Sequence, residues 1–280
     1  MDNNTIYERI TDQIISKLEA GTIPWQKPWN GGGMPKNLVS KKTYRGMNVF
    51  LLSCSSYSSP FWLTYKQAQD KGGQVRKGEK GTTVIFWKFL EKKETDETDD
   101  KKSKSVPMLK TYTVFNAEQC DGLKLPESDK KPLDFHPIRE CEKIVHGYQG
   151  PEIKHEEPRA FYRPSTDMVN MPKAETFRSN EEYYSTLFHE LAHSTGHDSR
   201  LARDIGHSQF GSATYSKEEL VAEMSSAMLC GIAGIENRTI DNSAAYIQSW
   251  LKVLKSDKKL LVSAGGQAQK ACDMIAGNQE

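Results

Sequence analysis

The chain has 280 residues, 36% hydrophobic and 27% charged, which is enough to bury one large core or two modest ones. No apolar run approaches the ~18 residues of a membrane-spanning helix, and the polar N-terminus does not resemble a signal peptide. We therefore expect a cytoplasmic protein with no membrane partner. The five cysteines include no CxxC pair, which argues against a cysteine zinc site or a disulfide framework.

The net charge of +1 conceals an uneven distribution along the chain. Residues 1–90 contain 13 Lys and Arg against 6 Asp and Glu, so the remaining residues contain 25 against 31. A basic first part followed by an acidic second part predicts two modules with different partners.

The first part of the chain predicts a mixed α+β module. A four-residue spacing of apolar side chains predicts an amphipathic helix over 4–20: Ile6, Ile10, Ile14 and Leu18. Segments 82–89 and 109–116 are rich in β-branched and aromatic residues and predict two paired strands. Between them, 11 of the 14 residues of 91–104 are charged, which predicts a solvated hairpin loop.

The second part predicts a helix-rich module. The Pro- and Lys-rich segment 123–137 predicts a linker, so we expect one domain at 1–122 and another at 138–280. The fold class is therefore α+β with two domains. Extended structure is expected at 160–172, and helices at 138–149, 180–195, 215–234, 244–255 and 264–277.

The segment FHELAHSTGH, residues 188–197, contains the motif HExxH. His189 and His193 are four residues apart on a helical segment, so both imidazoles can reach one ion. Glu190 is placed to take a proton from the attacking water of a hydrolytic reaction and to return it to the leaving nitrogen. The Ser179–Glu182 spacing of a capping box precedes the motif, and Gly196 follows it. Two surface histidines on an ordinary helix are the alternative.

A catalytic zinc site needs a third protein ligand and an open position. The template HExxHxxGxxH fails because position 199 is serine, and His197 is a poor geometric fit. A glutamate from the following helix is the other option, and EELVAE offers three. We assign Glu219 as the ligand and Glu223 as the carboxylate that holds a histidine in its tautomer. The reverse assignment and a solvated acidic helix face both stay open. Tyr215 and His207 are candidates for stabilising an oxyanion.

Four of the five tryptophans lie among lysines and arginines in the first ninety residues: Trp25, Trp29, Trp62 and Trp87. Single-stranded nucleic acid is bound by this combination, because bases stack on aromatic rings and cations meet the phosphates. The predicted DNA contacts are Trp25, Lys27, Trp29, Lys41, Lys42, Tyr44, Arg45, Trp62, Tyr65, Lys66, Arg76, Lys77 and Lys80. The alternative is that the tryptophans are core residues.

A succession of segments runs along the chain: IPWQKPW, YRGMN, FWLTYKQA, GGQVRKGEKG, FHELAHSTGHDSRL, YSKEELVAE and AAYIQSWLKVLKSDKKLL. In this order, over nearly the whole chain, they resemble the antirestriction protein ArdC family of plasmids and other mobile elements. The resemblance implies an N-terminal domain that binds single-stranded DNA and a C-terminal zincin-like metallopeptidase domain with one Zn²⁺. It carries His189, Glu190 and His193 over as the metallopeptidase motif. The acidic motif of the family matches Glu218, Glu219 and Glu223 without deciding which of them binds the metal.

The resemblance leads us to expect an antirestriction protein that binds single-stranded DNA, protects incoming DNA from host restriction and carries an accessory peptidase domain. One alternative is a DNA-directed zinc protease that cleaves DNA-bound or crosslinked proteins, such as a restriction enzyme. Another is an ordinary cytosolic peptidase. In a zincin, segment 160–172 would lie above the zinc helix and pair with an extended protein substrate.

Overall fold

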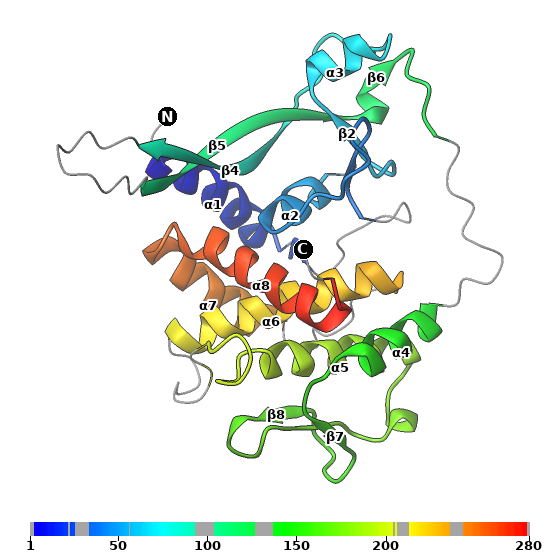
Figure 1. Ribbon diagram of the computed structural model, residues 1–280, viewed down its shortest axis with the longest axis vertical. Coiled ribbons are helices and arrows are strands. Elements are labelled where there is room, and N and C mark those ends of the chain that lie inside the picture. Colours follow the sequence, from blue (N-terminus) through cyan, green and yellow to red (C-terminus); the bar gives the residue numbers. More distant parts are fainter. Residues whose placement is uncertain are drawn as a thin grey trace, which may run out of the picture.

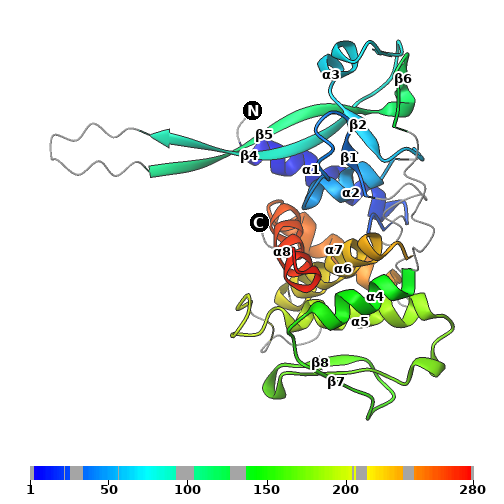
Figure 2. The same cartoon turned by 45° about the vertical axis from the view of Figure 1, so that its right-hand side comes forward.

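The computed structural model describes residues 3–21, 23–25, 34–55, 57–92, 104–126, 137–203, 205, 213–235 and 243–278. A four-stranded sheet lies at one end of the molecule and a three-stranded sheet at the other, with most of the helices between them (Figures 1 and 2). None of the described helices has the length and hydropathy needed to cross a bilayer. The predicted α+β class with a mixed N-terminal part and a helix-rich C-terminal part is confirmed.

The N-terminal part combines three helices with two sheets. Its helices are α1 (Asn3–Glu19), α2 (Met47–Ser53) and α3 (Tyr65–Asp70). The four-stranded sheet has the order β1 (Lys36–Asn37), β2 (Phe61–Leu63), β5 (Lys104–Asn116), β4 (Thr82–Lys92). A short ribbon pairs β3 (Gln74–Val75) with β6 (Cys120–Asp121), which follows the 3-10 turn η1 (Ala117–Gln119).

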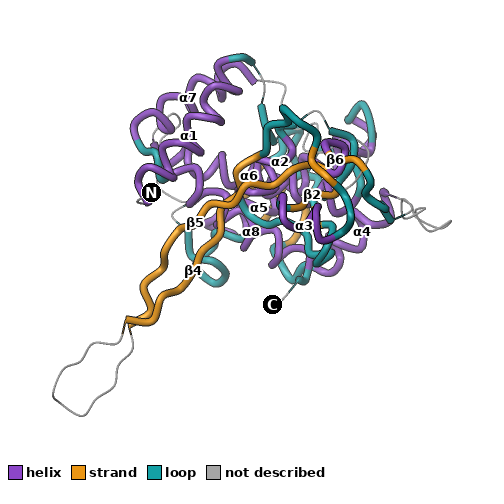
Figure 3. Tube along the Cα trace, turned by 90° about the horizontal axis from the view of Figure 1, so that it is seen from above, coloured by secondary structure: helices purple, strands orange, loops and turns teal. Residues whose placement is uncertain are grey.

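The predicted strand pair is confirmed as the antiparallel hairpin β4–β5, whose register runs from Thr82 opposite Val114 to Lys92 opposite Lys104. The strands are therefore longer than predicted and extend into the charged segment, whose residues 93–103 lie outside the described residues. Seen from above, the hairpin runs out beyond the helices (Figure 3). The outer edge of β4 is covered by α2, because the Asn48 amide donates to Ile85 O at 2.7 Å and accepts from Ile85 N at 2.8 Å.

The C-terminal part contains five helices and a small sheet. The helices are α4 (Pro137–Gly147), α5 (Asn180–Ser194), α6 (Ala213–Ala233), α7 (Ser243–Ser256) and α8 (Leu260–Ala276). The sheet has the order β7 (Glu152–Lys154), β9 (Met168–Asn170), β8 (Phe161–Arg163), with 3-10 turns η2 (Pro164–Thr166) and η3 (Ala174–Thr176). Both the expected helices and the expected extended segment at 160–172 are confirmed.

One hydrophobic core joins the two parts of the chain. The apolar face of α1 packs in the same cluster as residues of α5, α6, α7 and α8. Trp25 is fully buried there, with its ring edge-on to Phe50 at a centroid distance of 6.3 Å and to Trp250 at 5.2 Å. The structure describes residues 123–126 and 137 of the predicted linker and none of the residues between them.

Helices α2 and α8 approach closely across this junction. A Cβ atom on Gly265 of α8 would lie 3.0 Å from Met47 N, so a larger residue there would push the two helices slightly apart. Gly46, at φ 58°, donates its N–H to Gln269 Oε1 at 2.8 Å. Arg45 forms an ion pair with Asp273 at 2.5 Å. The N-terminal and C-terminal parts therefore share apolar and polar contacts.

The shared core predicts that Trp25→Ala destabilises the whole molecule. Removing a fully buried indole should lower the free energy of unfolding by about 3–5 kcal/mol. Unfolding should stay a single transition, because both parts use the same core. Chemical denaturation followed by circular dichroism measures both quantities. The control is Tyr65→Ala, whose ring is 46% exposed and whose loss should cost about 1 kcal/mol or less. Two separate transitions in the wild-type protein would contradict the shared core.

Candidate metal centre

Helix α5 presents the HExxH motif, and its ends are fixed by local interactions. Ser179 is the N-cap, and its side chain accepts a hydrogen bond from Glu182 N at 3.2 Å. In the predicted capping box the Glu182 carboxylate would accept a hydrogen bond from Ser179 N. It accepts instead from Arg178 N, at 2.8 Å. After the helix, a Cβ atom on Gly196 would lie 2.5 Å from the Ile205 side chain and 3.2 Å from the Arg203 guanidinium. Gly196 therefore lets the chain fold back against α5.

Three side chains from two helices converge on one point. His189 and His193 of α5 and Glu219 of α6 place one donor atom each within 4.8 Å of one another. The two Nε2 atoms are 3.1 Å apart, Glu219 Oε2 is 3.5 Å from His189 Nε2, and Glu219 Oε1 is 3.6 Å from His193 Nε2. Neighbouring ligands of a tetrahedral zinc ion are separated by about 3.3 Å, given bonds of about 2.0–2.1 Å. The cluster therefore fits a divalent cation in both donor type and spacing.

Two further carboxylates lie beside the Nδ1 atoms of the two imidazoles. His193 Nδ1 lies 3.2 Å from Glu218 Oε1, and His189 Nδ1 lies 3.5 Å from Glu223 Oε1. The hydrogen bond with Glu218 favours the tautomer of His193 that leaves Nε2 free to bind a cation, and the charge of Glu223 acts in the same direction on His189. Glu218 was predicted only as a member of the acidic motif, and its contact with His193 was not foreseen.

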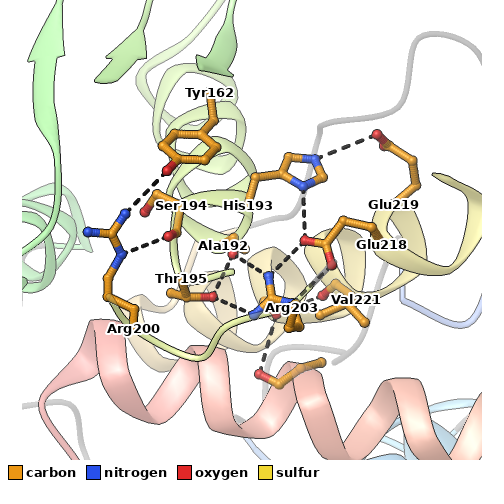
Figure 4. A network of polar contacts seen from close by, with 12 residues as sticks. Tyr162, Ala192, His193, Ser194, Thr195, Arg200, Arg203, Glu218, Glu219 and Val221 are labelled. Atoms are coloured by element: carbon orange, nitrogen blue, oxygen red, sulfur yellow. Dashed lines mark hydrogen bonds and ion pairs between the residues drawn. The ribbon is translucent and has the colours of Figure 1, made fainter. Parts of the chain in front are cut away.

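Arg203 fixes Glu218 in place (Figure 4). Its guanidinium donates to both carboxylate oxygens, with Nε 2.9 Å from Oε2 and Nη2 2.7 Å from Oε1. It also donates to Thr195 Oγ1 at 2.7 Å and to Ala192 O at 2.8 Å, which ties it to the end of α5. A bidentate, largely buried pair of this kind has one geometry, so Arg203 orients His193 through Glu218.

The electrostatics of the cluster oppose the effect of burial. Burial lowers the pKa of His189, but the hydrogen bond that it donates to Glu219 and the charges of Glu223, Glu219 and Glu190 raise it to about 10. Burial raises the pKa of Glu219, but the hydrogen bond that it accepts from His189 and the charges of both imidazoles lower it to about 2. Since the two Nε2 atoms face each other at 3.1 Å, at most one of them carries a proton. A cation bound by these atoms would displace that proton.

The cluster lies at the side of a cavity of about 380 Å³ beneath strand β8. Phe161 and Tyr162 of β8, Glu190 and Tyr215 are among the residues that line it. Tyr215 also hydrogen-bonds Glu219 and thereby lowers its pKa. The predicted alternative for oxyanion stabilisation, His207, lies outside the described residues.

Arg200 holds the small sheet above α5 (Figure 4). Its Nε donates to Ser194 O at 2.7 Å, and its Nη1 donates to Asp167 Oδ2 at 2.9 Å. Asp167 also accepts from the Tyr162 hydroxyl at 2.8 Å. β8 pairs with β9 on one side, and no described strand pairs with its other side. The strand that borders the cavity, β8, therefore has one edge free to pair with another chain.

Several predicted DNA contacts are wrong. Trp25, Trp62 and Tyr44 are buried, so their ring faces cannot stack on bases. The reason is that large rings stabilise most when they leave water, and tertiary packing offered these three a place in the core. Arg45 and Arg76 stay predictions, because both are exposed. Arg45 is ion-paired with Asp273, and Arg76 with Glu79 and Asp121.

The remaining predicted contacts divide into two sets. The exposed set consists of Lys41, Lys42, Tyr65, Lys66, Lys77 and Lys80. Lys27 and Trp29 lie outside the described residues. The basic character of the first ninety residues is thus present at the surface, whereas most of its placed tryptophan rings are not.

Comparison with known proteins shows similarity over almost the whole chain. Residues 4–115 match the family described as the N-terminal domain of anti-restriction factor ArdC, and residues 139–267 match a zincin-like metallopeptidase family. The metal-free crystal structure of the antirestriction ArdC protein from the R388 plasmid is 42% identical, with a TM-score of 0.79 and 98% of both chains covered. Its Mn(II)-bound structure has a TM-score of 0.80.

Curated relatives include longer and similar-sized proteins. Two proteins named DNA primase TraC from Escherichia coli are each 41% identical over 96% of this chain, which spans 27% of one and 20% of the other. The uncharacterized protein y4eC of Sinorhizobium fredii is 37% identical over 98% of this chain and 92% of its own length. The similarity to y4eC and to the R388 protein therefore extends over both domains together.

The geometry of the cluster predicts a graded loss of metal affinity. His193→Ala removes a donor atom and should abolish tight binding of Zn²⁺, measured by competition with a chromophoric chelator. Glu218→Gln keeps the donors but loosens His193, so its affinity should fall by about 10- to 100-fold. The control is His146→Ala, on the exposed side of α4, which should bind as the wild type does. A Glu218→Gln protein with undiminished affinity would contradict the role given to Arg203 and Glu218.

Proposed function

We propose that this protein binds single-stranded DNA and protects incoming DNA of a mobile element from restriction. The chain belongs to the ArdC antirestriction family, with an N-terminal ArdC domain and a zincin-like metallopeptidase domain. It would act in the cytoplasm of the host cell. The observation that carries the proposal is the 42% identity to an antirestriction protein over 98% of both chains. We place the DNA-binding domain at residues 1–122, the linker at 123–137 and the metallopeptidase domain at 138–280.

DNA binding is supported by the exposed basic side chains of the N-terminal domain. Lys41, Lys42, Lys66, Lys77 and Lys80 are exposed and can meet phosphates, and Tyr65 offers an exposed ring. Binding through phosphates and unpaired bases needs no particular sequence, which suits a protein that must act on any incoming strand.

We place one Zn²⁺ per chain at His189, His193 and Glu219, with Glu218 and Glu223 holding the imidazoles. A zinc ion there would supply a Lewis acid that polarises a carbonyl group and makes water more acidic. The Glu190 carboxylate, in the same cavity, would accept a proton from the attacking water and deliver it to the leaving nitrogen. The free edge of β8 would hydrogen-bond the backbone of an extended protein substrate.

A second candidate function is proteolysis of proteins bound or crosslinked to DNA, such as a restriction enzyme. It is favoured by a complete donor set beside Glu190 in a cavity bordered by a strand with a free edge. A domain that served only as a scaffold would need neither the general base nor the free edge. The two functions differ in whether protection requires hydrolysis.

Transfer of an unmodified plasmid into a restricting host separates them. The comparison uses wild type, Glu190→Gln and no protein, and the same transfer into a non-restricting host is the control for uptake. Replacing the general base should reduce peptide hydrolysis by about 10²- to 10⁴-fold while keeping shape and hydrogen bonding similar. We expect both proteins to protect equally. Protection by wild type alone would overturn the accessory role of the peptidase domain and establish that a protein is cut.

A further inference from the structure

The outward face of the β4–β5 hairpin carries aromatic and basic side chains that were not among the predicted DNA contacts. Phe86 and Lys88 of β4 share this face with Lys110 and Tyr112 of β5, because Phe86 is paired with Lys110, and Tyr112 is paired with Val84. Phe86 is 44% exposed and Tyr112 is 49% exposed. These four side chains are called the hairpin platform below.

The two faces of the hairpin have different environments. Ile85 and Leu109 point to the opposite face and are buried in the core that contains α1. In Figures 1 and 2, α1 and the helical body lie on that side of the hairpin. On the platform's own face, Val84 and Val114 are buried with Tyr44 in a second apolar cluster. The rings of Phe86 and Tyr112 lie at the border of this cluster and stay accessible to a partner.

The rings of the hairpin platform are held in place by each other and by the residues below them. Phe86 and Tyr112 pack edge to face at a centroid distance of 5.4 Å, and the buried Tyr44 lies 6.5 Å from Phe86. They border a shallow hollow of about 410 Å³. A partner that stacks on these rings would find them already ordered, so little conformational entropy would be lost on binding.

The charge of the hollow identifies the class of partner. Its described lining contains two lysines, Lys88 and Lys110, and no carboxylate. Across the part of the chain that the structure describes, neither ammonium group has an ion-pair partner. The cavity at the metal centre is the opposite, since its lining includes three carboxylates, of Glu190, Glu218 and Glu219. A polyanion is therefore favoured at the hairpin platform and disfavoured at the metal centre.

We propose that the hairpin platform is the base-stacking surface of this protein for single-stranded DNA. Unpaired bases stack on Phe86 and Tyr112, while Lys88 and Lys110 meet the flanking phosphates. Duplex DNA hides its base faces, so the platform discriminates for single strands by geometry. The inference rests on the proposed DNA-binding function, and it replaces the buried Trp25, Trp62 and Tyr44 as the stacking residues.

Oligothymidylate binding, measured by fluorescence anisotropy on the full chain, tests the proposal. The variant Phe86→Leu with Tyr112→Leu keeps apolar side chains but removes both ring faces, so affinity should fall by about 10-fold or more. Phe86→Tyr with Tyr112→Phe keeps two rings and should bind as the wild type does. The matched control is Phe177→Leu with Tyr183→Leu, an edge-to-face pair at 5.3 Å in the C-terminal domain. It should leave affinity unchanged, and thermal melting checks that each variant is folded.

Two further arms separate stacking from charge. Lys88→Gln and Lys110→Gln should each reduce the slope of log affinity against log salt by about 0.7. An abasic oligonucleotide of the same length should bind the wild type about 10-fold or more weakly than oligothymidylate, because it has phosphates but no bases. Equal binding of the abasic strand would overturn stacking.

The outcomes for the platform and for the proposed function are distinguishable. If the wild type binds oligothymidylate and the double leucine variant binds it equally well, the platform is wrong and DNA binding stands. If the wild type does not bind single-stranded DNA at any salt concentration, both the platform and the proposed DNA-binding function are wrong. A ten-fold loss in the platform variant alone supports both.

Discussion

Burial of charge on helix α6 is the constraint that shapes the metal centre. Residues Glu218, Glu219 and Glu223 are only 9%, 7% and 4% exposed, and an unpaired carboxylate at such depth costs several kcal/mol. The two imidazoles of α5 and the guanidinium of Arg203 offset that cost. The loop after α5 must therefore return Arg203 to the helix it has just left, and Gly196 is where the chain makes room for it. Helix packing, loop path and ligand orientation all follow from one requirement.

The two surfaces to which function is proposed lie on opposite sides of the helical body. The hairpin is at one end of the molecule, and α5 with β8 is at the other (Figure 1). A DNA strand on the hairpin and a protein chain along β8 would not compete for the same surface. The helices between them connect the two surfaces through continuous packing, because α1 packs on α7 and α8, and α2 packs on α8. The sign of the charge also differs, with lysines at the hairpin hollow and carboxylates at the cavity.

The sequence predicted correctly those positions that are set by neighbours in the same helix, and it failed for positions that are set by contacts between distant segments. The i, i+4 spacing of His189 and His193 sets their relative positions on one helix, so the spacing sufficed. Glu219 followed from the same reasoning applied to the next helix. The role of Glu218 did not, because it depends on Arg203, which reaches the site only through the fold of a loop. The fate of the tryptophans was also inaccessible, since Trp25 is buried by packing against residues more than two hundred positions away.

The contact between the first helix and the last ones also governs when the protein can fold. The Thr11 hydroxyl donates to Lys258 O, across 247 residues of sequence. At about 5–20 residues per second, a ribosome needs about 12–50 s to make the intervening chain. Throughout that interval α1 lacks its partners in α7 and α8, and such long-range contacts form late and slowly. Translation thus delivers both surfaces together, and a nascent or truncated chain is a substrate for chaperones and proteases before it is a working protein.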